Sequence, residues 1–209
     1  MEGNSTHVRS NNTPLWLNIL VHGGAAVPLL ILVVGALTGR LGFNPSQTAL
    51  HLTGRAALVF LLLSLAVTPI CQIFKLKGLS SIRRDLGLYA FKYALLHLLI
   101  YIVWDYRLDW TAIWQTFRQN HFIQIGLIAF FILLLLTLTS FNFWIAKLGK
   151  GWKYLHSLVY ISAILIIIHF AWAGKGNILL LQGDVVEPLI AALVLVVLLM
   201  IRLFFALRR

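Results

Sequence analysis

The stretch 152–172, WKYLHSLVYISAILIIIHFAW, decides how this sequence folds. It is apolar along its length, and an α-helix needs about 20 such residues to cross the hydrocarbon core of a membrane. It carries one histidine near each end, His156 and His169, and these are thirteen residues apart. At a rise of about 1.5 Å per residue, the two side chains lie roughly 20 Å apart along the helix axis. The stretch therefore predicts a membrane span with an ionisable group near each face.

Six apolar runs of this kind predict an all-α integral membrane protein with six transmembrane helices. The runs are 15–37, 50–74, 84–104, 122–144, 152–172 and 188–207. Residues 1–14 are polar and are predicted to form a disordered N-terminal tail, so that 15–209 is one transmembrane domain. The first run is too long for a signal-peptide core, and we expect it to be retained.

The composition supports this class, because 60% of the 209 residues are hydrophobic and only 11% are charged. The net charge of +11 does not indicate nucleic-acid binding, since the basic residues lie in short loops between apolar runs. Six spans place both termini and the second and fourth connections on one side, which holds 12 of the 17 basic residues. Cytoplasmic loops are enriched in Lys and Arg, so both termini are predicted to be cytoplasmic.

The predicted topology brings two histidines to one depth. Runs 84–104 and 152–172 both enter from the cytoplasmic side, and His97 and His169 lie in the outer half of their runs. An ionisable side chain inside a membrane is costly and marks function. Neutral imidazole is a favoured axial ligand of heme iron. We therefore predict that His97 and His169 bind one heme from both sides. His156 is predicted to lie at an inner level, near the cytoplasmic face.

The inner level leaves alternatives open. Thirteen residues of ideal helix place His156 and His169 about 140° apart, so either a π-bulge or twist brings them to one face, or His156 serves a site of different shape. An inner heme could use His156 with a second group such as His22, or keep an open position. His51, at the outer end of its run, is a candidate ligand or propionate contact. The alternative for each histidine is a structural bond to a backbone carbonyl or a hydroxyl.

Two further residue types bear on a heme. Guanidinium groups pair with propionates in a bidentate way, and the same groups also serve as interfacial anchors. The chain has one cysteine, Cys71, which excludes an internal disulfide and a CxxCH attachment, so any heme is held non-covalently as b-type. The candidate propionate contacts are Arg40, Arg55, Arg83 and Arg84.

Several runs resemble a known family. They are LHLTGRAALVFLLLSLAVTPI (50–70), RRDLGLYAFKYALLHLLIY (83–101), LTLTS (136–140) and KLGKGWKYLHSLVYISAILIIIHFAW (147–172). They are similar to the MsrQ (YedZ) family, the heme-binding membrane subunits of bacterial protein-methionine-sulfoxide reductase systems, within the wider ferric-reductase-like transmembrane family that includes the NADPH oxidases. The resemblance covers about residues 15 to 205. It implies a multi-pass protein of the bacterial inner membrane with one or two hemes b and with His97, His156 and His169 at ligand positions.

The resemblance also implies partners. Its members accept electrons from the quinone pool or a cytosolic flavin reductase and pass them to a periplasmic molybdoenzyme, the methionine-sulfoxide reductase catalytic subunit. An FMN is attributed to them, and no residue here indicates an FMN site. One departure is Arg83, since NADPH oxidases carry a histidine fourteen residues before the ligand of this span. Another is Gln119-Asn120-His121-Phe122, where relatives often have Arg-Pro.

Three functions follow as hypotheses. The first is an electron-transfer subunit whose catalytic chemistry lies in a partner chain. The second is a stand-alone ferric or oxygen reductase domain of the NADPH-oxidase type, fed by a separate flavoprotein because this chain has no GxGxxG motif. The third is a heme-free transporter or scaffold, and the lack of paired acids within the apolar runs argues against it.

Overall fold

The computed structural model describes residues 14–174 and 186–208, and within these ranges every regular element is a helix. Six helical segments are long and apolar enough to cross a membrane, which confirms the predicted class of multi-pass membrane protein. The predicted tail 1–14 lies outside the described residues except for Pro14. The elements are α1 (Leu15–Leu37), α2 (Pro45–Phe74), the 3-10 helix η1 (Lys77–Ser81), α3 (Ile82–Leu99), the π-helix η2 (Ile100–Asp105), α4 (Trp110–Gln119), α5 (His121–Leu138), α6 (Asn142–Leu148), α7 (Gly151–His156), α8 (Leu158–Ala173) and α9 (Val186–Leu207).

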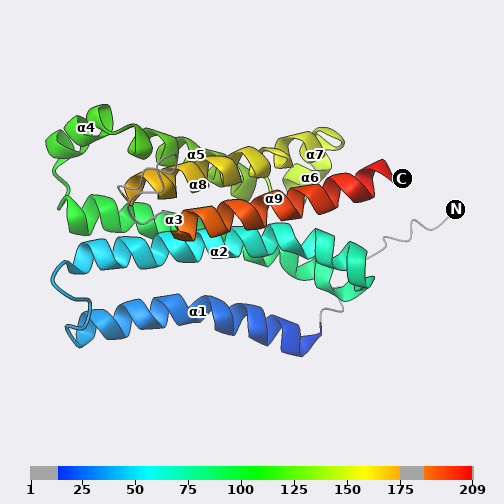
Figure 1. The fold of residues 1–209 in the computed structure, drawn as a ribbon, viewed down its shortest axis with the longest axis horizontal. Coiled ribbons are helices and arrows are strands. Elements are labelled where there is room, and N and C mark those ends of the chain that lie inside the picture. The colour runs from blue at the N-terminus through cyan, green and yellow to red at the C-terminus, as the bar shows by residue number, and fades with distance from the viewer. Residues whose placement is uncertain (1–13, 175–185, 209) are drawn as a thin grey trace, which may run out of the picture.

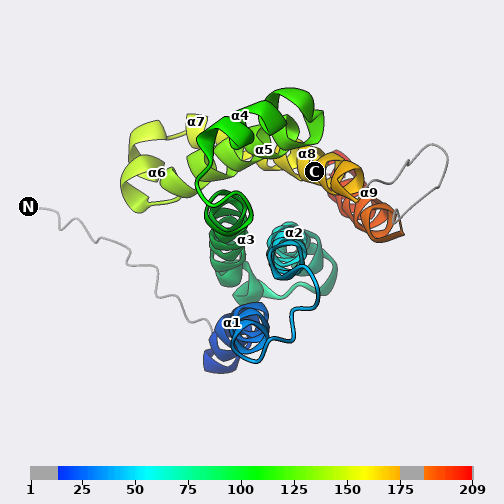
Figure 2. The same ribbon diagram turned by 90° about the vertical axis from the view of Figure 1, so that its left-hand side faces the viewer.

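Two antiparallel helix pairs form the centre of the bundle. The helix α2 packs most extensively against α3, and α5 packs most extensively against α8 (Figure 1). The end-on view in Figure 2 shows α1 on the far side of the α2–α3 pair from α5 and α8. The last span, α9, packs against both α2 and α8 and so joins the two pairs.

Small residues lie where the spans meet. Ala49, Ala90 and Ala163 are each 0% exposed. In a membrane the hydrophobic effect does not drive helices together. Helices associate there through van der Waals contacts, which small side chains strengthen by letting the backbones come close. Large apolar side chains such as Ile190 and Leu193 of α9 point outward instead, as expected where lipid is the solvent.

The second span begins earlier than predicted, at Pro45 instead of residue 50. Asn44 caps it, because the Gln47 backbone N–H donates to Asn44 Oδ1 at 3.3 Å, and proline is well suited to the first helical position. The added turn brings the Ser46 hydroxyl within 2.6 Å of Asp105 Oδ1 at the end of η2.

The prediction that the fourth span reaches residue 144 is wrong. The helix α5 ends at Leu138, and α6 is a separate short helix. The hydroxyls of Thr139 and Ser140 donate to the carbonyls of Leu135 and Leu136 at 2.7 and 2.6 Å. Such side chains offer the backbone an alternative to the helical ladder, and here the chain turns away from the span.

The connection between the third and fourth spans holds a helix that the hydropathy pattern does not reveal. The helix α4 lies across one end of the bundle (Figure 1). It begins where Asp109 Oδ1 accepts the Ala112 backbone N–H at 3.0 Å. Trp110 and Trp114, four residues apart, share a face of it and are exposed. The aspartate cap and this spacing are the local signals for the helix.

Candidate functional site

The predicted pair of histidines comes together between α3 and α8. The ring centroids of His97 and His169 are 6.2 Å apart, and the ring planes are nearly perpendicular at 89°. Each helix starts at the same end of the bundle, so the two side chains meet at one depth, as their positions in the sequence predicted (Figure 1). Their role as ligands stays a prediction.

Both rings are oriented by the same kind of bond. His97 Nδ1 lies 2.9 Å from the Leu50 carbonyl oxygen, and His169 Nδ1 lies 2.7 Å from the Phe122 carbonyl oxygen. A carbonyl oxygen only accepts hydrogen bonds, so each Nδ1 carries the proton. In a neutral imidazole the other nitrogen, Nε2, then holds a free lone pair, which is the state that binds a metal. The site therefore offers two oriented Nε2 atoms, each with a lone pair that can bind a metal.

His156 has a different environment. Its Nε2 lies 3.2 Å from Thr139 Oγ1, and its ring stacks on that of Trp152 with centroids 4.0 Å apart. The Thr139 hydroxyl donates its single proton to Leu135 O at 2.7 Å, so His156 Nε2 supplies the proton in the longer contact. His97 and His169 are called the outer pair below, because the sequence predicts that they lie in the outer half of their spans. The nitrogen that is free in the outer pair is occupied in His156.

The fifth span is interrupted next to His156. The helix α7 ends at His156, a turn lies at Ser157, and α8 begins at Leu158. The sequence left open whether a π-bulge or twist brings His156 and His169 to one face or whether His156 serves a site of different shape. The structure shows a turn at Ser157. The Trp152 indole N–H donates to the Thr139 carbonyl at 2.9 Å and ties α7 to the end of α5.

The other candidate histidines lie apart from these two places. His22 is exposed on α1, and its Nδ1 lies 2.7 Å from the Tyr89 hydroxyl on α3, so the structure gives it a structural partner. His51 lines an open cavity of about 820 Å³ between α1 and α2, together with Arg40 and Arg55. The candidate residues His51, Arg40 and Arg55 therefore line one hollow near the start of α2.

The candidate arginines are differently engaged. Arg55 Nε forms an ion pair with Glu187 Oε2 at 2.7 Å, linking α2 to α9. The Arg84 guanidinium lies over the Phe141 ring at 5.7 Å from its centroid. Arg83 is exposed near the start of α3, and its backbone carbonyl accepts the Ser64 hydroxyl at 2.9 Å.

Arg202 has a role that was not predicted from the sequence, where it counted only as a basic residue near the C-terminus. Its Nη2 donates to the Leu65 carbonyl at 3.3 Å, and its guanidinium lies 5.2 Å from the Tyr160 ring centroid. Its Nε is buried and has no hydrogen-bond partner within the described residues. The available signal was an arginine inside an apolar run, which is costly and therefore meaningful.

The fold and the paired rings define a class, namely a multi-pass helical membrane protein with two facing histidines between two of its spans. The family model described as ferric reductase like transmembrane component matches residues 53–167. Three similar proteins are each called protein-methionine-sulfoxide reductase heme-binding subunit MsrQ. The one from Ralstonia nicotianae is 38% identical over 88% of this chain and 83% of its own length. Those from Xanthomonas oryzae pv. oryzae and Caulobacter vibrioides are 37% and 35% identical, over 86% and 85% of this chain and 82% and 81% of theirs.

This chain therefore belongs to the ferric reductase like transmembrane component family and, within it, to the MsrQ family. The resemblance read from the runs around residues 50–70, 83–101 and 147–172 is confirmed. The similarity to bacterial relatives supports a place in the bacterial inner membrane.

Proposed function

We propose that this protein is a b-type cytochrome that holds a heme between His97 and His169 and carries electrons across the membrane for a methionine-sulfoxide reductase system. The observation that carries the proposal is the pair of perpendicular rings whose centroids are 6.2 Å apart. The names of its relatives, which are heme-binding subunits, support the same assignment.

The spacing of the rings fits one metal atom bonded to both. A bond between a metal and an imidazole nitrogen is about 2 Å long, and the ring centre lies about 1 Å beyond the nitrogen. Two rings on opposite sides of one metal thus have centroids about 6 Å apart. The 6.2 Å separation of His97 and His169 agrees with this value.

The number of donors favours a heme over a bare ion. Among the described residues, no group of three or more His, Cys, Asp or Glu side chains is placed to hold a metal. A protein zinc site uses three or four such ligands, whereas heme iron needs only axial ones because its macrocycle supplies the rest. Two imidazoles and a free lone pair on each are therefore sufficient for a heme.

The residues of this chain have three tasks in such a site. A bound heme supplies reversible one-electron chemistry at its iron. His97 and His169 hold it at a set depth, and the carbonyls of Leu50 and Phe122 keep each Nε2 free for it. The surrounding apolar helices exclude water, which influences the potential of the group.

Donor and acceptor complete the proposal. Electrons enter from the quinone pool or a cytosolic flavin reductase and leave to a periplasmic molybdoenzyme that reduces methionine sulfoxide. His156 serves a separate inner site, because its partners are Thr139 and Trp152 and not the outer pair. The relatives' name supports the methionine-sulfoxide reductase system as the destination.

The proposal is tested by heme quantitation and redox titration of the purified protein. We expect His97→Ala and His169→Ala each to remove the same heme and His156→Ala to leave that heme in place. His121→Ala is the control, because His121 is exposed at the start of α5. An unchanged heme content in both His97→Ala and His169→Ala would overturn the proposal. Loss of one and the same heme in these two variants and in His156→Ala would refute the separate inner site.

The direction of transfer has its own test. The protein is reduced in proteoliposomes, and its heme spectrum is followed as a periplasmic catalytic subunit and methionine sulfoxide are added. We expect reoxidation only when both are present. Rapid reoxidation by a ferric chelate or oxygen alone would favour the stand-alone reductase instead.

A further inference from the structure

The two outer histidines sit in two copies of one arrangement. In each, a histidine Nδ1 bonds a carbonyl of a residue 47 positions earlier, Leu50 for His97 and Phe122 for His169. In each, a glycine stands four residues after that carbonyl, in LHLTG (50–54) and FIQIG (122–126). The first copy lies in the α2–α3 pair and the second in the α5–α8 pair.

Helix geometry explains why a glycine belongs at this position. A helical carbonyl at position i already accepts the N–H of residue i+4, so an imidazole N–H must approach its second lone pair from the side. The Cβ of residue i+4 tilts toward the helix N-terminus and covers that approach. A glycine at i+4 leaves the carbonyl open to the ring.

The surroundings of Gly54 and Gly126 agree with this explanation. A Cβ added to Gly126 would lie 2.6 Å from His169 Nδ1 and 2.7 Å from its Cε1, closer than real Cβ atoms come. A Cβ added to Gly54 would lie 3.2 Å from His97 Nδ1 and 3.3 Å from its Cε1. Other helical glycines face different groups, since a Cβ at Gly87 would meet the Ser64 hydroxyl at 3.5 Å and one at Gly24 would meet nothing within 4 Å.

We propose that Gly54 and Gly126 are positioning residues that set the tautomer and orientation of the two heme ligands by exposing the carbonyls of Leu50 and Phe122. This inference rests on the proposed heme between His97 and His169. A hydrogen bond donated by Nδ1, the nitrogen that does not bind the metal, makes a ligating imidazole more basic. Loss of this hydrogen bond weakens metal binding by about 10- to 100-fold. The glycines thereby also lower the reduction potential, because a more basic ligand favours the ferric state.

A packing role makes a different prediction. Glycines at helix interfaces often serve only to let two backbones come close. Replacing such a glycine weakens the fold but leaves the ligands of the remaining folded protein unchanged. Replacing Gly54 or Gly126 disturbs the hydrogen bond and the orientation of the ligating histidine. The reduction potential and the spectrum of the bound heme therefore distinguish the two roles.

The experiment compares Gly126→Ala and Gly54→Ala with wild type and with the controls Gly87→Ala and Gly24→Ala. Heme content, reduction midpoint and the low-temperature electron paramagnetic resonance spectrum of the ferric form are measured, with circular dichroism as the check on folding. We expect Gly126→Ala to retain heme at least 10-fold more weakly. We expect Gly54→Ala to keep heme but to shift its midpoint to a more positive value with altered g-values, and both controls to match wild type.

The outcomes separate this inference from the proposed function. If His97→Ala and His169→Ala lose heme while both glycine variants match wild type, the positioning role is overturned and the cytochrome stands. If wild type binds no heme, both the proposed cytochrome function and the positioning role are overturned. Should Gly126→Ala fail to fold, the midpoint of Gly54→Ala decides alone. Equal loss of heme in the two controls would also overturn the positioning role.

Discussion

At the scale of single residues, hydrogen-bond partners distinguish histidines that look alike in the sequence. His97 and His169 each donate from Nδ1 to a backbone carbonyl, whereas His156 meets a threonine hydroxyl through Nε2. The nitrogen available to a metal therefore differs between the outer pair and the inner residue. This difference supports the proposal of a separate inner site.

Thr139→Val tests that difference. Valine keeps the shape of threonine but removes the hydroxyl that His156 Nε2 contacts at 3.2 Å. We expect the heme held by His97 and His169 to keep its content and midpoint, because Thr139 contacts His156 and not that pair. Optical redox titration measures both. A shifted midpoint of the outer heme would contradict the separation of the two levels.

At the scale of helices, the contact surfaces explain which spans stay together. Ala163 of α8 is fully buried among the helices, while Leu193 of α9 is 64% exposed and faces outward. Small residues permit close helix contact in membranes, and the outward face needs only to be apolar. The two positions therefore tolerate substitution differently.

Ala163→Leu is expected to destabilise the bundle. Extra methylene groups in a tightly packed interface typically cost about 1–3 kcal/mol, because neighbouring side chains and helices must shift. The matched control is Leu193→Ala, which removes volume from the lipid-facing side and should leave stability nearly unchanged. Unfolding in detergent, followed by circular dichroism, compares the two. Equal stability of both variants would show that α8 does not pack as the structure has it.

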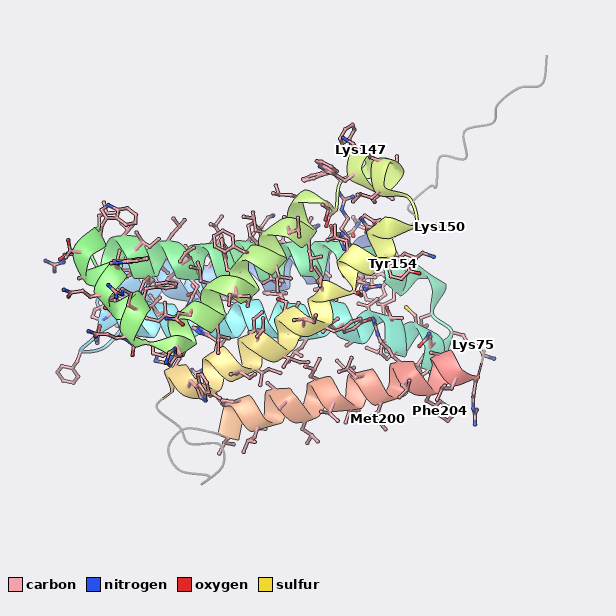
Figure 3. The ribbon with its side chains drawn as sticks, turned by 90° about the horizontal axis from the view of Figure 1, so that it is seen from above. Lys75, Lys147, Lys150, Tyr154, Met200 and Phe204 are labelled. Carbon is pink, nitrogen blue, oxygen red and sulfur yellow. The ribbon has the colours of Figure 1, made fainter. Side chains whose placement is uncertain are left out.

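At the scale of the whole molecule, one end of the bundle carries a concentration of basic residues. Figure 3 shows Lys75, Lys147, Lys150 and Tyr154 at the same end as Phe204 near the close of α9. The helix α1 begins and α9 ends there (Figure 1). By the positive-inside rule we predict that this end faces the cytoplasm. This orientation would place the paired rings of His97 and His169 nearer the periplasm, on the side of the proposed acceptor.

Cysteine labelling tests this orientation. In a Cys71→Ser background, a single cysteine is placed at Thr111 in α4 or at Lys150 between α6 and α7, both of which are exposed. We expect a membrane-impermeant maleimide to label Thr111→Cys in intact spheroplasts and Lys150→Cys only after the membrane is opened. The reverse pattern would invert the topology and place the outer pair on the cytoplasmic side.

What the sequence determined by itself is the set of six spans and the shared depth of His97 and His169. Both depend on local quantities, namely hydropathy over about 20 residues and a helix rise of about 1.5 Å per residue. Sequence periodicity also placed His156 on its own level. The hydropathy pattern failed at residues 139–144, because a Thr-Ser pair ends the helix within an apolar run. It also did not reveal α4, which is amphipathic and is capped by Asp109.

Only the tertiary structure decided which nitrogen of each ring is free and which glycines face the rings. The decisive bonds join residues 47 positions apart, from His97 to Leu50 and from His169 to Phe122. It also decided that Arg55 pairs with Glu187 across two helices, which no local pattern indicates. Such contacts follow from how helices pack against one another, and the packing depends on the side chains of several spans at once.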